Sequence, residues 1–330
     1  MDTTTSYLGF TLPHPFIAGA SPLGYHLDSI KRLEDNGCAA IVLHSLFEEQ
    51  ITLAAKGLIH HRDPFDRDFA AALVDFPAAD DYALGPQEYA AHVSQAKAAV
   101  KIPVIASLNG TSGEWWLKFA RIIEQAGADA LELNLYDVIT DLNFPGSAVE
   151  HQIVDIVKDL KRTLKIPIAV KLSPFFASFG NLAQQLDLAG ADALVMFNRF
   201  YQPNIDIKTM RPSPQVELST SAELLLRLRW LAILHGRVRP SLAVTGGVAT
   251  PNDGVKAVLA GADAVQMVSA LLRHGPAYVS AMRLGLEHWM EWHQLTGLNE
   301  VRGRVSLKQT KDPAAFERAN YIRALQSWSH

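Results

Sequence analysis

Four polar residues stand at the ends of short apolar runs in this sequence, where their side chains could do chemistry. Lys171 follows the run PIAV, and an asparagine ends three other runs, at Asn109, Asn134 and Asn198. A side-chain amide both donates and accepts hydrogen bonds, which suits a planar polar ring or a carboxylate. These residues therefore predict a binding site for a small polar molecule.

Three interpretations of Lys171 stay open on the sequence alone, because a lysine in an apolar run needs a partner. It could form an ion pair with a carboxylate such as Glu132. It could stabilise negative charge on a bound ring. Its amine could also form a Schiff base with a carbonyl substrate.

The most specific local pattern is AVTGGVATPNDG. Gly246 and Gly247 end an apolar run, and Thr250, Pro251 and Asp253 follow as the N-cap, first residue and capping-box acid of a helix. Backbone amides at a helix start, approached through glycines, form an anion site. The pattern therefore predicts a phosphate site.

The elements that must position these residues are indicated by a repeated phrase. AGADA occurs at 126–130, 189–193 and 260–264, each time between a helical pattern and an apolar run. Glycine just past a helix end adopts the left-handed conformation there. Continuous apolar runs are typical of strands in a parallel sheet that is covered on both faces. The phrase therefore marks the joint of a repeated βα unit.

Such runs predict strands at 16–21, 39–45, 103–110, 130–135, 167–173, 193–200, 241–247 and 264–270. Eight strands that alternate with helices predict an α/β fold, a closed (β/α)8 TIM barrel rather than an open doubly wound sheet. We expect a single domain over 1–330, with the barrel at about 16–274 and C-terminal helices at about 275–330.

In such barrels, chemistry collects at the C-terminal ends of the strands. Those ends carry Ser21, His44, Asn109, Asn134, Lys171, Asn198, Gly246, Gly247 and Ser269. Two long connections, 46–86 and 201–219, leave the same face, where long loops usually serve a site. The loops after the last two strands are where we expect phosphate.

The C-terminal segment 312–328 is expected to form a helix that begins at Asp312 and Pro313. Its apolar residues are Phe316, Ile322, Leu325 and Trp328. They predict that this helix docks onto the barrel or onto a second subunit.

Composition excludes several classes of function. The chain is 48% hydrophobic and 19% charged, with a net charge of −4 and scattered Lys and Arg residues. We therefore expect no nucleic acid and no membrane as partners. Cys38 is the single cysteine, which excludes an internal disulfide framework and fits a reducing, cytoplasmic compartment. No ligand spacing indicates a metal site.

Together, the segments KLSPFF, ELN and TGGVATPNDGVKAVLAGADAVQM, with the asparagine that ends the sixth predicted strand, resemble the dihydroorotate dehydrogenases. These are FMN-dependent (β/α)8 enzymes, and the similarity runs from HPFIAGAS to about residue 295. The resemblance implies that FMN binds non-covalently and that a hydride moves between a CH–CH bond of a small polar substrate and flavin N5. It also favours a homodimer.

The resemblance assigns roles residue by residue. It implies that the flavin is contacted by Ala20, Ser21, Asn134 and Lys171. It implies that the ribityl phosphate is bound by Gly246, Gly247 and Ser269. Asn109, Asn134 and Asn198 would reach the substrate.

The flavin half of the site largely matches the family pattern, whereas the substrate half does not. His44–Ser45 stands where the family has a lysine before a serine, and Val268 replaces a phosphate-loop glycine. The segment NLYDVITDLNFPG offers Tyr136 and Asp137 where the family carries a catalytic Cys or Ser. We therefore expect a substrate other than dihydroorotate.

The candidate catalytic residues are Asp137, Tyr136, His44 and Lys171. Two other functions stay open. One is a non-redox lyase or aldolase that binds phosphate and uses Lys171 as an amine. The other is a non-catalytic flavin-binding subunit that works with a redox partner protein.

Overall fold

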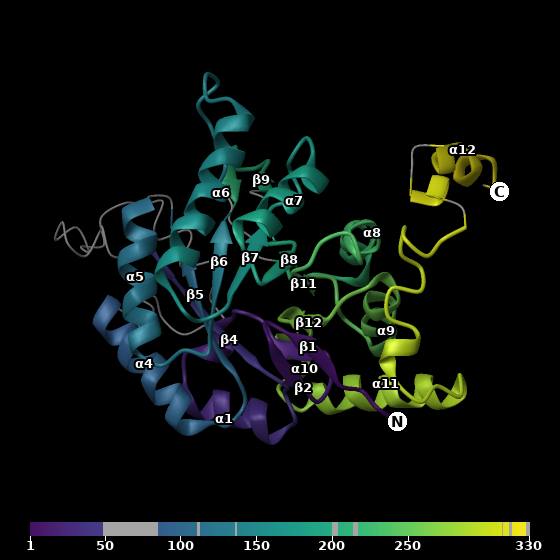
Figure 1. Ribbon diagram of the computed structural model, residues 1–330, viewed down its shortest axis with the longest axis horizontal. Coiled ribbons are helices and arrows are strands. Elements are labelled where there is room, and N and C mark those ends of the chain that lie inside the picture. Colours follow the sequence, from purple (N-terminus) through teal and green to yellow (C-terminus); the bar gives the residue numbers. More distant parts are fainter. Residues whose placement is uncertain are drawn as a thin grey trace.

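Eight parallel strands form a closed barrel in the computed structural model, which describes residues 1–48, 85–110, 113–135, 137–199, 204–213, 217–311, 313–316 and 319–327 (Figure 1). The strand order is β11-β12-β3-β4-β5-β6-β7-β8. The strands are β3 (Phe16–Ala18), β4 (Ile41–Phe47), β5 (Val104–Asn109), β6 (Ala130–Leu135), β7 (Ile168–Leu172), β8 (Ala193–Met196), β11 (Ser241–Thr245) and β12 (Ala264–Met267). The predicted (β/α)8 barrel is confirmed.

Helices surround this barrel (Figure 1). They are α1 (Leu27–Asp35), α4 (Pro86–Ala99), α5 (Gly113–Gln125), α6 (Gly146–Thr163), α7 (Phe179–Ala189), α8 (Leu224–Leu234), α9 (Pro251–Ala260), α10 (Ser269–His274), α11 (Tyr278–Trp292) and α12 (Ala319–Gln326). Short 3-10 helices lie at Pro22–Gly24, Ser221–Glu223, Leu298–Glu300 and Pro313–Phe316. In the part of the chain that the structure describes, no helix has the length and apolar character to cross a bilayer.

Strand β6 shows how alternation places the site. Leu131, Leu133 and Leu135 pack in the layer between the barrel and the helices. Glu132 and Asn134, which alternate with them, therefore point into the barrel. A separate inner cluster of apolar residues, half of them alanines, fills the barrel interior below them. The sequence ALELNL thus buries its leucines outward and turns its polar residues toward the barrel axis.

An N-terminal hairpin that the sequence did not indicate closes the other end of the barrel. Strands β1 (Thr5–Tyr7) and β2 (Phe10–Leu12) pair in antiparallel register. Tyr7, Leu8 and Leu12 belong to the inner apolar cluster. The hairpin therefore covers the barrel interior with large side chains.

Carboxylates tie successive strands together at the N-terminal end of the barrel. In each AGADA phrase the aspartate accepts a hydrogen bond from a backbone N–H at or near the start of the preceding strand. The pairs are Asp129 with Val104 (2.7 Å), Asp192 with Ile168 (2.7 Å) and Asp263 with Leu242 (2.8 Å). Carboxylates near helix ends also accept hydrogen bonds from backbone N–H groups that precede strands. The pairs are Glu34 with Lys101 (2.7 Å), Glu124 with Lys165 (2.6 Å) and Asp187 with Arg239 (3.1 Å). We call this set the carboxylate ring.

The structure corrects one predicted strand end and bears on two predicted connections. Strand β12 ends at Met267, and Ser269 begins α10 instead of extending the strand to residue 270. A second hairpin, β9 (Asn204–Asp206) and β10 (Arg211–Ser213), lies within the connection 201–219. Most of the connection 46–86 lies outside the described residues.

The C-terminal segment does not form one continuous helix. The 3-10 turn Pro313–Phe316 precedes α12, and Asp312 and Trp328 lie outside the described residues. Phe316 of this turn is partly buried and packs against the core, as predicted. Helix α12 stands away from the barrel (Figure 1), and Ile322 and Leu325 are exposed. Docking of α12 onto its own barrel is therefore not observed. Docking onto a second subunit stays a prediction.

Candidate functional site

A cavity of about 230 Å³ opens at the C-terminal end of the barrel. Its lining residues are Ala20, Ser21, Pro22, Tyr25, His44, Ser45, Phe47, Asn109, Asn134, Lys171 and Asn198. The structure therefore brings together the flavin and substrate contacts that the sequence assigned to strands β3 to β8. This volume suits a ring system and not an entire nucleotide, because pockets for drug-sized ligands are larger, at roughly 300–1,000 Å³.

Lys171 forms a buried ion pair at the floor of this cavity. Its Nζ lies 3.2 Å from Oε1 of Glu132, whose side chain is fully buried. The side-chain amide of Gln266 donates to the other oxygen of Glu132 at 2.5 Å. The ion-pair interpretation of Lys171 is therefore observed. An ammonium held in this way offers a positive charge to a bound ring, and it is a poor nucleophile for Schiff-base chemistry.

Asn134 is fixed by two serines. Its amide nitrogen donates to Oγ of Ser45 at 2.8 Å and to Oγ of Ser107 at 3.0 Å. The amide oxygen of Asn134 is buried and has no hydrogen-bond partner within the described ranges. Nε2 of His44 is in the same state. Because buried polar atoms are normally satisfied, these two atoms indicate a ligand, and they fit the ring of a flavin or of a substrate that carries N–H groups.

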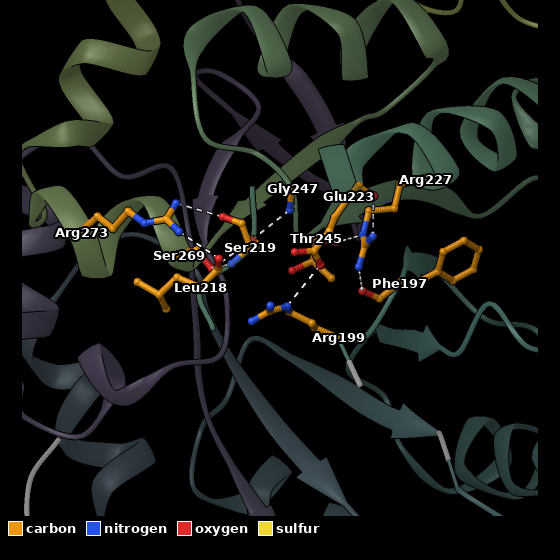
Figure 2. Close-up of polar contacts among 10 residues, drawn as sticks. All are labelled: Phe197, Arg199, Leu218, Ser219, Glu223, Arg227, Thr245, Gly247, Ser269 and Arg273. Atoms are coloured by element: carbon orange, nitrogen blue, oxygen red, sulfur yellow. Dashed lines mark hydrogen bonds and ion pairs between the residues drawn. The ribbon is translucent and has the colours of Figure 1, made fainter. Parts of the chain in front are cut away.

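The predicted phosphate site is a compact cradle at the ends of β11 and β12 (Figure 2). The backbone N–H of Gly247 donates to Oγ of Ser219 at 3.1 Å. Oγ of Ser269 accepts from the backbone N–H of Ser219 at 3.0 Å and from its hydroxyl at 2.9 Å. Gly247 and Ser269 were predicted for this role, whereas Ser219 was not. We call Gly246, Gly247, Ser219 and Ser269 the phosphate cradle.

Both glycines of the cradle are required by conformation and by space. Gly246 and Gly247 have φ values of 80° and 79°, which favour glycine. A Cβ on Gly246 would lie 2.8 Å from the guanidinium of Arg227, and one on Gly247 would collide with the backbone of Leu224. Chain segments therefore pack directly against this glycine pair.

Arginines surround the cradle (Figure 2). Arg227 is buried and donates to the carbonyl oxygens of Thr245, Glu223 and Phe197. Arg273 donates to the carbonyl oxygens of Ser219 and Leu218, both at 2.9 Å. Arg199 pairs with Glu223 at 3.2 Å. This excess of positive charge fits a phosphate, and these arginines shape the backbone of the cradle.

The helix that follows the glycine pair begins with the predicted capping box. One oxygen of Asp253 accepts from the hydroxyl of Ser221 at 2.6 Å, from the backbone N–H of Thr250 at 2.9 Å and from that of Ala249 at 3.1 Å. Burial raises the pKa of the Asp253 carboxyl, but these hydrogen bonds together outweigh it, and the pKa lies below its ordinary value. Asp253 therefore holds the loop after β11 as a carboxylate.

Replacing Asp253 by asparagine is expected to lower the free energy of unfolding by about 1–2 kcal/mol at neutral pH, the usual range for a lost cap. A carboxyl with a depressed pKa contributes stability above its unfolded-state pKa and loses it as the pH falls through its folded-state pKa. The difference between variant and wild type should therefore shrink as the pH falls below 3.8. Urea unfolding at several pH values measures it, with Asp155→Asn on the exposed face of α6 as the control. A difference that stays constant down to low pH would contradict this role.

The candidate catalytic residues do not all meet in the cavity. His44 and Lys171 line it, but Asp137 lies on a neighbouring groove of about 830 Å³ outside the barrel, together with Leu135 and Phe175. The reason is the alternation along β6, which turns Asn134 inward and Leu135 outward. Tyr136 lies outside the described residues.

Comparisons with known proteins agree with this geometry. The sequence profile of the dihydroorotate dehydrogenase family matches residues 83–290. The chain is 25% identical over 316 residues to the catalytic subunit of dihydroorotate dehydrogenase B (NAD(+)) from Thermoplasma volcanium, an alignment that covers 93% of this chain and 99% of that protein. It is 23% identical over 321 residues to the NAD-dependent dihydropyrimidine dehydrogenase subunit PreA of Escherichia coli K12, covering 92% of this chain and 76% of that protein. The family profile spans more than half of the chain, so the chain belongs to the dihydroorotate dehydrogenase family of oxidoreductases.

Proposed function

We propose that this chain is an FMN-dependent oxidoreductase that acts on a CH–CH bond of a small polar substrate. The observation that carries the proposal is the presence of a phosphate cradle and a ring-sized cavity at the same end of one barrel. When bound, FMN would supply a ring that takes up a hydride from the substrate and releases it to an acceptor.

The residues of the chain divide the binding between them. The cradle residues Gly247, Ser219 and Ser269 would hold the phosphate by turning toward it N–H and O–H groups that now bond to one another. Lys171 would stabilise the negative charge that develops on the ring during reduction, since its ammonium lines the cavity. Asn109, Asn134 and Asn198 would orient the ring and the substrate.

The proton chemistry of the substrate half is proposed to differ from that of the family. Cys38, the single cysteine, is buried in the core, where burial raises the pKa of its thiol to about 12. It is therefore no base for the site. Asp137 and Tyr136 remain the candidates for the proton-transferring group, and both would have to approach the cavity from the loop after β6. This difference supports a substrate other than dihydroorotate.

A second protein is part of the proposal. The relatives named above are a catalytic subunit and a subunit PreA. We propose that this chain also passes electrons to a redox partner protein. We further propose that the chain forms a homodimer. The lyase or aldolase alternative loses support, because Glu132 already holds the Lys171 ammonium.

The first test is the absorption spectrum of the protein after incubation with FMN and desalting. We expect a flavin band that survives desalting in the wild type. The double variant Ser219→Ala/Ser269→Ala should bind FMN roughly 10- to 100-fold more weakly, because hydrogen bonds to a charged group are lost. Ser94→Ala removes a hydroxyl from the exposed face of α4 and serves as the control. A wild-type protein without a flavin band would contradict the proposal.

The substrate part is tested by anaerobic reduction of the bound flavin. Dihydroorotate is expected to leave the flavin band unchanged. Rapid bleaching by dihydroorotate would show that the chain keeps the ordinary family substrate. Retained flavin with no reduction by any candidate donor would favour the non-catalytic subunit.

A further inference from the structure

Two histidine rings meet at one carbonyl oxygen beside the cavity. Nδ1 of His44 lies 3.3 Å from the carbonyl oxygen of Gly24, and Nε2 of His92, on α4, lies 2.7 Å from the same oxygen. A carbonyl oxygen only accepts hydrogen bonds, so each of these nitrogens carries a hydrogen. Both side chains are buried. The geometry therefore places the hydrogen of a neutral His44 ring on Nδ1.

The surroundings keep the His44 ring neutral. Burial, together with the charge of His92, lowers the pKa of His44 to about 3. Burial lowers the pKa of His92 as well. The other titratable groups that face the ring are Tyr25, stacked on it with ring centres 3.9 Å apart, and Tyr89, edge-on at 5.1 Å. Lys171 also lines the cavity, and its ion pair with Glu132 has no net charge.

The second nitrogen of His44 is consequently a bare acceptor. Nε2 is buried, belongs to a ring that lines the cavity, and has no hydrogen-bond partner among the residues that the structure describes. Asn134 lines the same cavity, and its amide oxygen is also buried without a hydrogen-bond partner within the described ranges. Since a buried acceptor without a donor is costly, the cavity is built for a ligand that brings its own donors.

The same cavity offers little to an anion. Lys171 is the single lysine or arginine among the described lining residues, and its ammonium is shared between Glu132 and the ring that the proposed function places beside it. A carboxylate placed against Nε2 of His44 would oppose one acceptor with another. A negatively charged substrate group is therefore disfavoured next to His44, whereas N–H and O–H groups are favoured there.

We propose that His44 is a specificity-determining residue whose Nε2 accepts a hydrogen bond from an uncharged N–H or O–H group of the substrate. A carboxylate in the same position is disfavoured, because it offers no hydrogen to Nε2. His92 is a positioning residue that acts through the Gly24 carbonyl. The inference rests on the proposed function, because it names the substrate class of the same cavity: uncharged cyclic amides and alcohols, in preference to ring carboxylates.

The experiment compares two probes by isothermal titration calorimetry, uracil and orotate, which share one ring and differ by a carboxylate. Wild-type protein incubated with FMN is expected to bind uracil at least roughly 10-fold more tightly than orotate, the scale of one satisfied buried hydrogen bond. His44→Lys should shift this ratio toward orotate by roughly 10- to 100-fold. His288→Lys, the same substitution on the exposed face of α11, should leave the ratio unchanged.

Further variants keep the proposal falsifiable if His44→Lys fails to fold. His44→Gln retains a side-chain acceptor and should keep the preference for uracil. His44→Leu should lose affinity for uracil without gaining affinity for orotate. His92→Leu should weaken the preference for uracil over orotate several-fold, because the Gly24 carbonyl loses its hydrogen bond from His92. A wild-type preference for orotate, or equal ratios in all of these variants, would overturn the proposal.

A spectroscopic signature separates this role from a purely structural one. Long-range ¹H–¹⁵N NMR spectra are expected to show His44 neutral, with its hydrogen on Nδ1, until the pH falls toward about 3. A charged His44 at neutral pH, or a hydrogen on Nε2, would refute the acceptor role. The NMR spectra need no bound flavin. A protein that retains no FMN would therefore defeat the proposed function, while the protonation and tautomer of His44 would still decide whether its Nε2 is an acceptor.

Discussion

Replacing Lys171 by methionine is expected to lower the free energy of unfolding by about 3–5 kcal/mol, the cost of leaving one member of a buried ion pair unpaired. The remaining charge would be Glu132, whose side chain is fully buried and keeps one hydrogen bond from the Gln266 amide. Urea denaturation followed by circular dichroism measures the loss. The same variant should also slow flavin reduction, because the positive charge beside the ring is gone.

A double variant distinguishes the cost of leaving Glu132 unpaired from the cost of losing the whole ion pair. Lys171→Met combined with Glu132→Gln removes both charges, and most of the lost stability should return, because neutral replacements of a buried pair are often tolerated. Flavin reduction should stay slow in the double variant. Lys158→Met on the exposed face of α6 is the matched control, with an expected cost below about 1 kcal/mol. A single variant at Lys171 as stable as this control would contradict the buried-pair argument.

Replacing Gly247 by alanine is expected to abolish FMN retention. The residue has a φ of 79°, where an alanine costs roughly 1–2 kcal/mol. Its Cβ would also collide with the backbone of Leu224, which no side-chain rotation can relieve. The loop would have to move, and the Gly247 N–H would then leave Ser219 and the phosphate. We expect an affinity for FMN at least roughly 100-fold lower, measured by fluorescence titration.

A matched glycine isolates the effect of the collision. Gly127 also has a positive φ, of 91°, but a Cβ added there meets nothing within 4 Å. Gly127→Ala should therefore show the conformational cost in urea denaturation while its flavin affinity stays at the wild-type level. If Gly247→Ala retains FMN as well as Gly127→Ala does, the cradle is not the phosphate site.

The strand ends were predictable because they depend on local patterns. The run ALELNL places its polar residues two apart, and a period of two fixes which face of a strand they share. Register then brings the right neighbours together, since Asn134 pairs with Lys171 across β6 and β7. Glu132 lies one layer below Asn134, and this is why it could be named as a partner for Lys171.

The rest of the site depends on contacts between distant segments. Ser219 follows a long connection, and its partners Gly247 and Ser269 lie 28 and 50 residues further along the chain. Arg227 sits in a stretch whose leucines and arginines read as an ordinary helix, and no sequence signal indicates that it bonds three carbonyl oxygens. The tautomer of His44 depends on the Gly24 carbonyl, whose position only the folded chain defines.

The carboxylate ring has a consequence for how freely this protein can change. Each of its hydrogen bonds lies at the opposite end of the strands from the cavity and the phosphate cradle. Residues that do not line the cavity therefore also hold the strands together. Substitutions in the loops above the cavity can alter which molecule is accepted while the barrel keeps its shape, and this division suits the chain as a scaffold for directed evolution of new substrate preferences.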